Sequence, residues 1–235
     1  MKDKVVLVTG GAGNLGRAVT RTFLEAGAHV AVPFYKNDPP SALDALASEF
    51  GSRLHSFALD LTTERGAEQT IRQVVEWGKQ LDVVAHLVGG YSGSASLADT
   101  PLEVWTRMVD LNMTSAYLIS RFAVPRFLQA GRGSLVFVSS RAAYQERSDL
   151  AAYAATKSGL ITLAQAIGEE NGPRGIRSNV VVLDVIDTED NRRSMPDADH
   201  ARWVKPAEVA RVILFLASDE AAGVNAAAIP VYGRG

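Results

Sequence analysis

The chain has 235 residues, 47% of them hydrophobic and 21% charged, a balance typical of a globular protein with one sizeable core. Its 24 basic and 26 acidic side chains leave a net charge of -2. This charge gives no electrostatic attraction for nucleic acid or an anionic membrane, so we expect neither partner. The absence of cysteine excludes thiolate metal sites and fits a cytoplasmic location. No metal site is expected.

The first half of the chain alternates short apolar runs with helical patterns. β-branched apolar runs predict buried parallel strands at residues 5–8, 29–34, 53–58 and 83–88. The run at 5–8 is too short for a signal-peptide core or a membrane span. Helical patterns lie between the strands. The first of them ends at Gly27, and the next two cover residues 41–50 and 64–79. This order of elements implies a right-handed, doubly wound sheet.

The second half repeats the alternation. It predicts helices at residues 102–129, with a break near Pro125, at 150–171, and at 205–217, where Pro206 suits the first turn. Strands are expected at 134–139, 176–183 and 227–231. The whole chain, 1–235, therefore predicts one α/β domain with a mostly parallel seven-stranded sheet and helices on both faces. Residues 186–204 are polar and fit no element, so we interpret them as an irregular substrate lid.

A glycine-rich turn lies between the first strand and the first helix. It contains Thr9, Gly10, Gly13, Asn14, Leu15 and Gly16. Such a turn also occurs as a plain tight connection, but its place after an N-terminal buried strand favours dinucleotide binding. Free backbone N–H groups and the positive helix end would then bind a pyrophosphate. Asn14 stands where a glycine is usual, and we expect it to tolerate a positive φ there.

Tyr153 and Lys157 are four residues apart in a helical pattern and so share one face of the helix. An ammonium beside a phenol lowers the pKa of the phenol toward the range of an acid or base catalyst. Alone, the pair also fits an ordinary amphipathic helix. Ser140, thirteen residues before Tyr153, supplies a second polar group.

The motifs TGGAGNLG (9–16), VDLNMTSAY with Asn112, and YAATK (153–157), together with Asp60 and Ser140, resemble the short-chain dehydrogenase/reductase family in its short single-domain branch. The resemblance covers essentially the whole chain and implies a Rossmann-like fold. It also implies an NAD(P)-dependent oxidoreductase that moves a hydride between a nicotinamide cofactor and a small carbonyl, alcohol or quinonoid molecule.

The resemblance also implies roles for single residues. Tyr153 would be the general acid or base, Lys157 would lower its pKa and bind the nicotinamide ribose, Ser140 would bond the substrate oxygen, and Asn112 would hold a relay water. The implied cofactor-binding residues are Thr9, Gly10, Gly13, Asn14, Leu15, Gly16, Tyr35, Lys36, Asp60, Leu61, Gly89, Tyr153, Lys157, Ile186 and Thr188. Each of three residues also fits a structural role: Asn112 bonding a neighbouring backbone group, Ser140 capping a strand end, and Asp60 capping the next helix.

Two departures from the family pattern lie near the implied site. The usual Asn-Asn-Ala-Gly is replaced by His86, Leu87, Val88 and Gly89, and we expect a packing or structural hydrogen-bonding role for His86. The usual Pro-Gly after the sixth strand is replaced by Leu183 and Asp184. Neither change touches the proton-transfer groups.

The end of the second strand bears on the choice of cofactor. Enzymes that use NAD usually place an acid there, but this chain has Phe34, Tyr35 and Lys36. No carboxylate would repel a 2′-phosphate, and Lys36 or Arg17 would attract one. The sequence therefore favours NADP(H) over NAD(H).

The lid partly resembles that of quinoid dihydropteridine reductases, as does the Gly-Gly-Tyr turn at residues 89–91. Those enzymes generally lack the serine that Ser140 supplies here. Tyr91, Tyr144, Met195 and Trp203 are candidate contacts for a flat or aromatic substrate, or else lid packing. Two other functions stay open, a dinucleotide-sensing regulator without turnover and a nucleotide-sugar epimerase or dehydratase. Family resemblance also predicts a homo-oligomer, a tetramer or dimer.

Overall fold

A computed structural model describes residues 1–35, 41–93, 95–145 and 147–233. Its seven-stranded sheet has the order β3-β2-β1-β4-β5-β6-β7, and every pair of neighbours is parallel. The strands are β1 (Val5–Thr9), β2 (His29–Phe34), β3 (Leu54–Ala58), β4 (Val83–His86), β5 (Gly133–Ser140), β6 (Ile176–Leu183) and β7 (Ala228–Val231). The order of the strands reverses between β1 and β4, and ligands of such sheets bind at the carboxyl ends beside this point.

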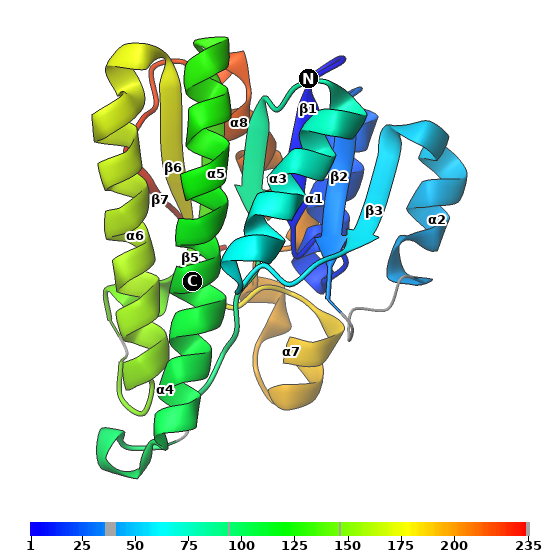
Figure 1. The fold of residues 1–235 in the computed structure, drawn as a ribbon. Coiled ribbons are helices and arrows are strands. Elements are labelled where there is room, and N and C mark those ends of the chain that lie inside the picture. The colour runs from blue at the N-terminus through cyan, green and yellow to red at the C-terminus, as the bar shows by residue number, and fades with distance from the viewer. Residues whose placement is uncertain (36–40, 94, 146, 234–235) are drawn as a thin grey trace.

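Helices cover both faces of the sheet, which confirms the predicted Rossmann-like fold (Figure 1). They are α1 (Asn14–Glu25), α2 (Ser41–Phe50), α3 (Glu64–Gly78), α4 (Leu102–Val109), α5 (Ser115–Ala130), α6 (Ala151–Asn171), α7 (Glu189–Ser194) and α8 (Pro206–Ala217). Buried side chains of α3, α5 and α6 form the core on one face, and those of α1, α2 and α8 form it on the other.

Strand β1 shows why the sheet is buried on both sides. Val5 and Leu7 belong to the first core, whereas Val6 and Val8 belong to the second, because successive side chains of a strand point to opposite faces. All four are at most 2% exposed. A continuous apolar run is the pattern that such a strand requires.

The predicted break near Pro125 is wrong. Pro125 lies inside α5 on its exposed side, where water can bond the carbonyl that a proline leaves without a donor. The helical column is instead interrupted between α4 and α5 by five residues of π-helix (Asp110–Thr114), here called the π segment. Such segments often lie at functional sites, and this one carries Asn112.

The lid (residues 186–204) is more regular than the sequence predicts. Thr188 accepts a hydrogen bond from the Asn191 N–H and caps α7, which begins with two acidic residues and ends with two arginines, as the helix dipole favours. A β-bridge between Ile186 and Val204 joins the two ends of the lid. In Figure 1, α7 lies beyond the carboxyl ends of the strands, so the lid is beside the expected site.

Strand β4 ends at His86, two residues before the predicted end. The Leu87 N–H is shared between the carbonyl and Oγ1 of Thr9, both at 3.2 Å, and the Val88 N–H donates to Thr9 Oγ1 at 3.4 Å. Within the described residues, no helix is both long and apolar enough to cross a membrane.

Candidate active site

The turn after β1 needs glycine at two points. Gly10 has φ 68°, and a Cβ there would lie 3.1 Å from the Val88 backbone nitrogen. At Gly16, a Cβ would lie 2.0 Å from the Gly10 carbonyl oxygen, a separation that no side chain tolerates. Asn14 begins α1 and is not among the described residues with positive φ, so the turn accommodates asparagine without the positive φ that it was expected to tolerate.

The start of α1 is suited to an anion. Gly13 is the N-cap, the first turn carries no acidic side chain, and no side chain caps it among the described residues. The first N–H groups of a helix have no partner within the helix, and the positive end of its dipole favours negative charge. The close-packed glycines and this open helix end fit the pyrophosphate of a dinucleotide.

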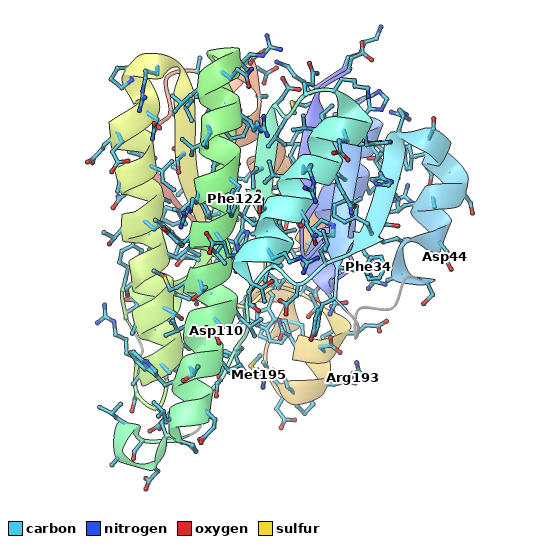
Figure 2. The ribbon with its side chains drawn as sticks, viewed as in Figure 1. Phe34, Asp44, Asp110, Phe122, Arg193 and Met195 are labelled. Atoms are coloured by element: carbon cyan, nitrogen blue, oxygen red, sulfur yellow. The ribbon has the colours of Figure 1, made fainter. Side chains whose placement is uncertain are left out.

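Asn14 joins this turn directly to the lid. Its Nδ2 donates to Asp190 Oδ2 at 2.7 Å, and its Oδ1 accepts from Arg17 Nη2 at 3.0 Å. Arg193 also donates to Asp190, and Figure 2 shows Arg193 on α7. The hydrogen bond from Asn14, followed by that from Arg193, lowers the pKa of the Asp190 carboxyl. The substitution of glycine by asparagine thus gives the lid an attachment point 176 residues away in the chain.

Ser140 and Tyr153 come together at the carboxyl end of β5. Ser140 is the last residue of β5, and Tyr153 lies half-buried in the first turn of α6. Burial raises the pKa of the Tyr153 phenol, and a hydrogen bond with Ser140 partly offsets this. Ser140 Oγ also accepts from the Ala142 N–H at 3.2 Å, so the strand-end cap considered from the sequence is present as well.

Lys157 lies one helical turn after Tyr153 and is 6% exposed. Its Nζ donates to the Val138 carbonyl at 3.0 Å and lies 5.8 Å from the centroid of the Tyr153 ring. Burial lowers the pKa of Lys157 to about 8. Burial has the largest effect on the Tyr153 phenol, so its pKa is raised rather than lowered, opposite to the direction expected from the sequence.

Asn112 is fully buried beside Lys157. Its Oδ1 accepts from the Gly90 N–H at 2.9 Å, and its Nδ2 donates to the Gly90 carbonyl and to Thr156 Oγ1, both at 3.1 Å. A Cβ on Gly89 would lie 2.7 Å from Asn112 Oδ1 and 3.1 Å from Lys157 Nζ. The backbone-bonding role considered for Asn112 is therefore present, and Gly89 is the residue between Asn112 and Lys157.

For the residues expected to bind the adenine, the structure shows local contacts and exposure. Asp60 Oδ1 accepts from the Thr62 N–H at 2.9 Å and from its hydroxyl at 2.7 Å, while Thr63 caps α3. Asp60 thus forms the turn before α3, and the alternative reading of Asp60 as the helix cap is wrong. Leu61 is buried and Tyr35 is 48% exposed. Lys36 lies outside the described residues.

Of the candidate substrate residues, Tyr91 lies against the catalytic candidates. Its ring packs edge-on against that of Tyr153, with centroids 5.2 Å apart. Tyr144 and Met195 are 48% and 37% exposed, and no described contact joins either to Tyr153. Figure 2 shows Met195 on the lid, across from Asp110 in the π segment.

Trp203 lines a cavity of about 400 Å³ that sequence reasoning did not predict. Three of the other lining residues follow neighbouring strands, namely Arg141 after β5, Asp184 after β6 and Tyr232 after β7. Arg141 Nη1 pairs with Asp184 Oδ2 at 2.7 Å, and its guanidinium carbon lies 5.6 Å from the Tyr232 ring centroid. Each of these three residues directly follows a predicted strand, which was the available signal for a shared site. Only the order of the strands in the sheet shows that the three side chains lie together.

Comparisons with known proteins agree with this geometry. A family model described as enoyl-(acyl carrier protein) reductase matches residues 10–233. The chain belongs to the short-chain dehydrogenase/reductase family. It is similar to 3-oxoacyl-[acyl-carrier-protein] reductase of Thermotoga maritima, with 28% identity over 99% of this chain and 98% of the relative. Membership makes it an NAD(P)-dependent oxidoreductase.

Two solved members of the family have nearly the same structure. A short-chain dehydrogenase/reductase from Mycobacterium ulcerans superimposes with a TM-score of 0.93 and 27% identity, over 100% of this chain and 90% of that one. A protein of Beutenbergia cavernae described as an NAD(P)-dependent gluconate 5-dehydrogenase, with bound NADP, gives a TM-score of 0.89 and 25% identity, over 99% and 96% of the chains. The resemblance of the lid to quinoid dihydropteridine reductases stays a prediction.

Proposed function

We propose that this oxidoreductase transfers a hydride between a nicotinamide dinucleotide and the carbonyl or alcohol carbon of a small molecule, or a quinonoid ring, with Tyr153 as general acid and base. The observation that carries the proposal is the meeting of the Tyr153 phenol with Ser140, one helical turn from the buried Lys157 ammonium. A sensor without turnover would not need these three groups together.

Each side chain has a defined task in this mechanism. When bound, the nicotinamide supplies or accepts the hydride. Ser140 and Tyr153 hydrogen-bond the substrate oxygen, and the raised pKa of Tyr153 keeps the phenol protonated at neutral pH, as a proton donor in reduction must be. The buried charge of Lys157 stabilises the phenolate as it forms. Asn112 is assigned to the proton relay because only Gly89 separates it from Lys157.

The cofactor would be held by residues from several elements. The turn at residues 10–16 and the start of α1 would bind the pyrophosphate, Asp60 and Leu61 the adenine, Lys157 the ribose of the nicotinamide, and Ile186 and Thr188 the nicotinamide itself. We favour NADP(H) over NAD(H), because β2 ends in Phe34 rather than in a carboxylate. The Beutenbergia relative holds NADP at low occupancy and a structural neighbour from Brucella melitensis holds NADH, so the choice rests on the end of β2.

The test is oxidation of NADH and of NADPH, followed against a panel of ketones, aldehydes, quinones and quinonoid pterins. Tyr153→Phe should lower kcat by about 10²- to 10⁴-fold, the usual contribution of general acid catalysis. Tyr117→Phe is the matched control, because Tyr117 is 47% exposed on α5 and its hydroxyl bonds only the surface Arg121 among the described residues. Full turnover by Tyr153→Phe would contradict the mechanism.

We also propose that the enzyme is a cytoplasmic homo-oligomer, a tetramer or dimer, joined through the long helices and the C-terminal strand. Strand β7 is an edge of the sheet, and an edge offers unpaired backbone groups to a second copy. Trp105 on α4 is an exposed aromatic residue. Light scattering after gel filtration tests this, and a monomer at micromolar concentration would contradict it.

A further inference from the structure

His86, which replaces the first asparagine of the family pattern, uses both of its ring nitrogens. It ends β4, is 1% exposed, and lies in register with Thr9 of β1. Its Nδ1 lies 3.0 Å from Thr9 Oγ1, and its Nε2 lies 3.2 Å from Ser115 Oγ. Thr9 and Ser115 are both fully buried, so no water competes for these contacts.

The partners of the two hydroxyls decide where the imidazole carries its proton. Ser115 Oγ donates its single hydrogen to the Leu111 carbonyl at 2.7 Å and can therefore only accept from His86. Nε2 must then carry the proton, which leaves Nδ1 as the acceptor for the hydroxyl hydrogen of Thr9. Thr9 Oγ1 in turn accepts from the Leu87 and Val88 N–H groups. Every polar atom in this chain of bonds is satisfied by one arrangement of hydrogens.

The chain of bonds ends at two backbone segments that meet at the catalytic candidates. At one end, Leu87 and Val88 begin the loop that continues to Gly89 and Gly90. At the other end, Leu111 immediately precedes Asn112 in the π segment. Asn112 bonds back to both the N–H and the carbonyl of Gly90. The loop and the π segment are therefore joined twice, once through His86 and once through Asn112.

We propose that His86 is a positioning residue, which as the neutral Nε2–H tautomer fixes the loop 87–90 against the π segment and thereby holds Asn112 and Gly89 beside Lys157. This inference rests on the proposed function for its effect on turnover. An asparagine at position 86 is too short to reach both Thr9 and Ser115 as the imidazole does. The hydrogen bond to Ser115, here called the Ser115 branch, is thus the contact that the histidine adds to the bond with Thr9, the Thr9 branch.

Two substitutions separate the two branches. His86→Asn keeps a polar group near the Nδ1 position and loses the bond to Ser115, whereas His86→Gln keeps an amide N–H near the Nε2 position. Ser115→Ala removes the same branch from the other side. Ser120→Ala is the matched control, because Ser120 is also buried and donates to the carbonyl four residues back at the same 2.7 Å, but has no histidine partner among the described residues.

Each variant is characterised by its kinetics, as kcat and cofactor Kd, and by hydrogen exchange of the Gly90 amide, which bonds Asn112. His86→Asn and Ser115→Ala should lower kcat by about 10- to 100-fold, the cost of a misplacement on the order of 1 Å. They should also speed Gly90 exchange and raise the cofactor Kd, because the released loop carries Gly89. His86→Gln and Ser120→Ala should stay within about 3-fold of the parent in kcat. Equal kcat and equal exchange in all four variants would overturn the proposal.

A third readout does not depend on turnover. Nitrogen NMR of the wild-type imidazole should show the Nε2–H tautomer at neutral pH, and an Nδ1–H tautomer or an imidazolium would overturn the proposal. If the wild-type enzyme turned over no member of the substrate panel, the proposed function would fail, while the NMR signal and Gly90 exchange would still decide the role of His86.

Discussion

Replacing Lys157 by methionine should stabilise the protein at neutral pH while it removes the charge that the mechanism needs. Lys157 is buried, and its pKa falls from 10.5 to about 8. At about 1.4 kcal/mol per pH unit, this difference corresponds to about 3 kcal/mol of burial cost for the charged form. The lost hydrogen bond to the Val138 carbonyl offsets about 1 kcal/mol. Lys157→Met should therefore gain about 2 kcal/mol in free energy of unfolding at pH 7.

The pH dependence carries the stronger test. Between pH 8 and 10.5 the unfolded chain keeps the proton on Lys157 while the folded chain has lost it, so the wild type gains stability with rising pH. The advantage of Lys157→Met should shrink over this window and become a deficit of about 1 kcal/mol above it, where only the lost hydrogen bond remains.

Urea unfolding followed by tryptophan fluorescence at pH 7, 9 and 10.5 measures this difference. Lys2→Met, at an exposed position, is the control and should track the wild type at every pH. A Lys157→Met difference that stays constant from pH 7 to 10.5 would refute the claim that a buried ammonium strains the fold.

Two further predictions concern the cofactor turn and the lid. Gly16→Ala should abolish dinucleotide binding and lower Tm, because its Cβ would lie 2.0 Å from a backbone oxygen. Gly13→Ala should keep the wild-type Tm, because its Cβ would lie 3.4 Å from the nearest atom. Equal Tm values for the two variants would contradict the packing argument. Asn14→Gly and Asp190→Asn should both speed amide exchange in residues 186–204, since each weakens the 2.7 Å bond. The exposed neighbour Glu189→Gln should not, and unchanged exchange in the first two would rule out the attachment.

Periodicity predicted the sheet well, because its strands are buried on both faces and read as continuous apolar runs. Val5 to Val8 alternate between the two cores, and any polar residue there would be buried without a partner. The break in the helical column was misplaced because the sequence shows a proline but not a π segment. Proline is a visible signal, whereas a π segment has no residue signature; this one contains Asn112, which bonds Gly90.

The site was predicted where a helix fixes the spacing and missed where folding brings strands together. Tyr153 and Lys157 share a face of α6 because they are four residues apart. Their pKa values depend on burial, which the spacing does not contain, so the direction expected for Tyr153 was wrong. The pairing of Arg141 with Asp184 follows from the neighbouring positions of β5 and β6.

The lid also makes a contact between residues far apart in the sequence, which no local pattern predicts. Its polar composition was the basis for the prediction that it covers the site. Thr188 followed by two acidic residues was an available signal for a capped helix. The bond between Asn14 and Asp190 had no such signal, because it joins residues 176 positions apart through the arrangement of α1 and α7.

The central claim, hydride transfer with proton donation by Tyr153, is tested most directly with cofactor deuterated at the transferring position. The substrate that turns over in the panel is incubated with deuterated NADPH, and the product is analysed by mass spectrometry. The wild-type enzyme should place one deuterium on the reacting carbon, and Tyr153→Phe should form labelled product about 10²-fold or more slowly. Product without the label, or labelled product formed by Tyr153→Phe at the wild-type rate, would contradict the account.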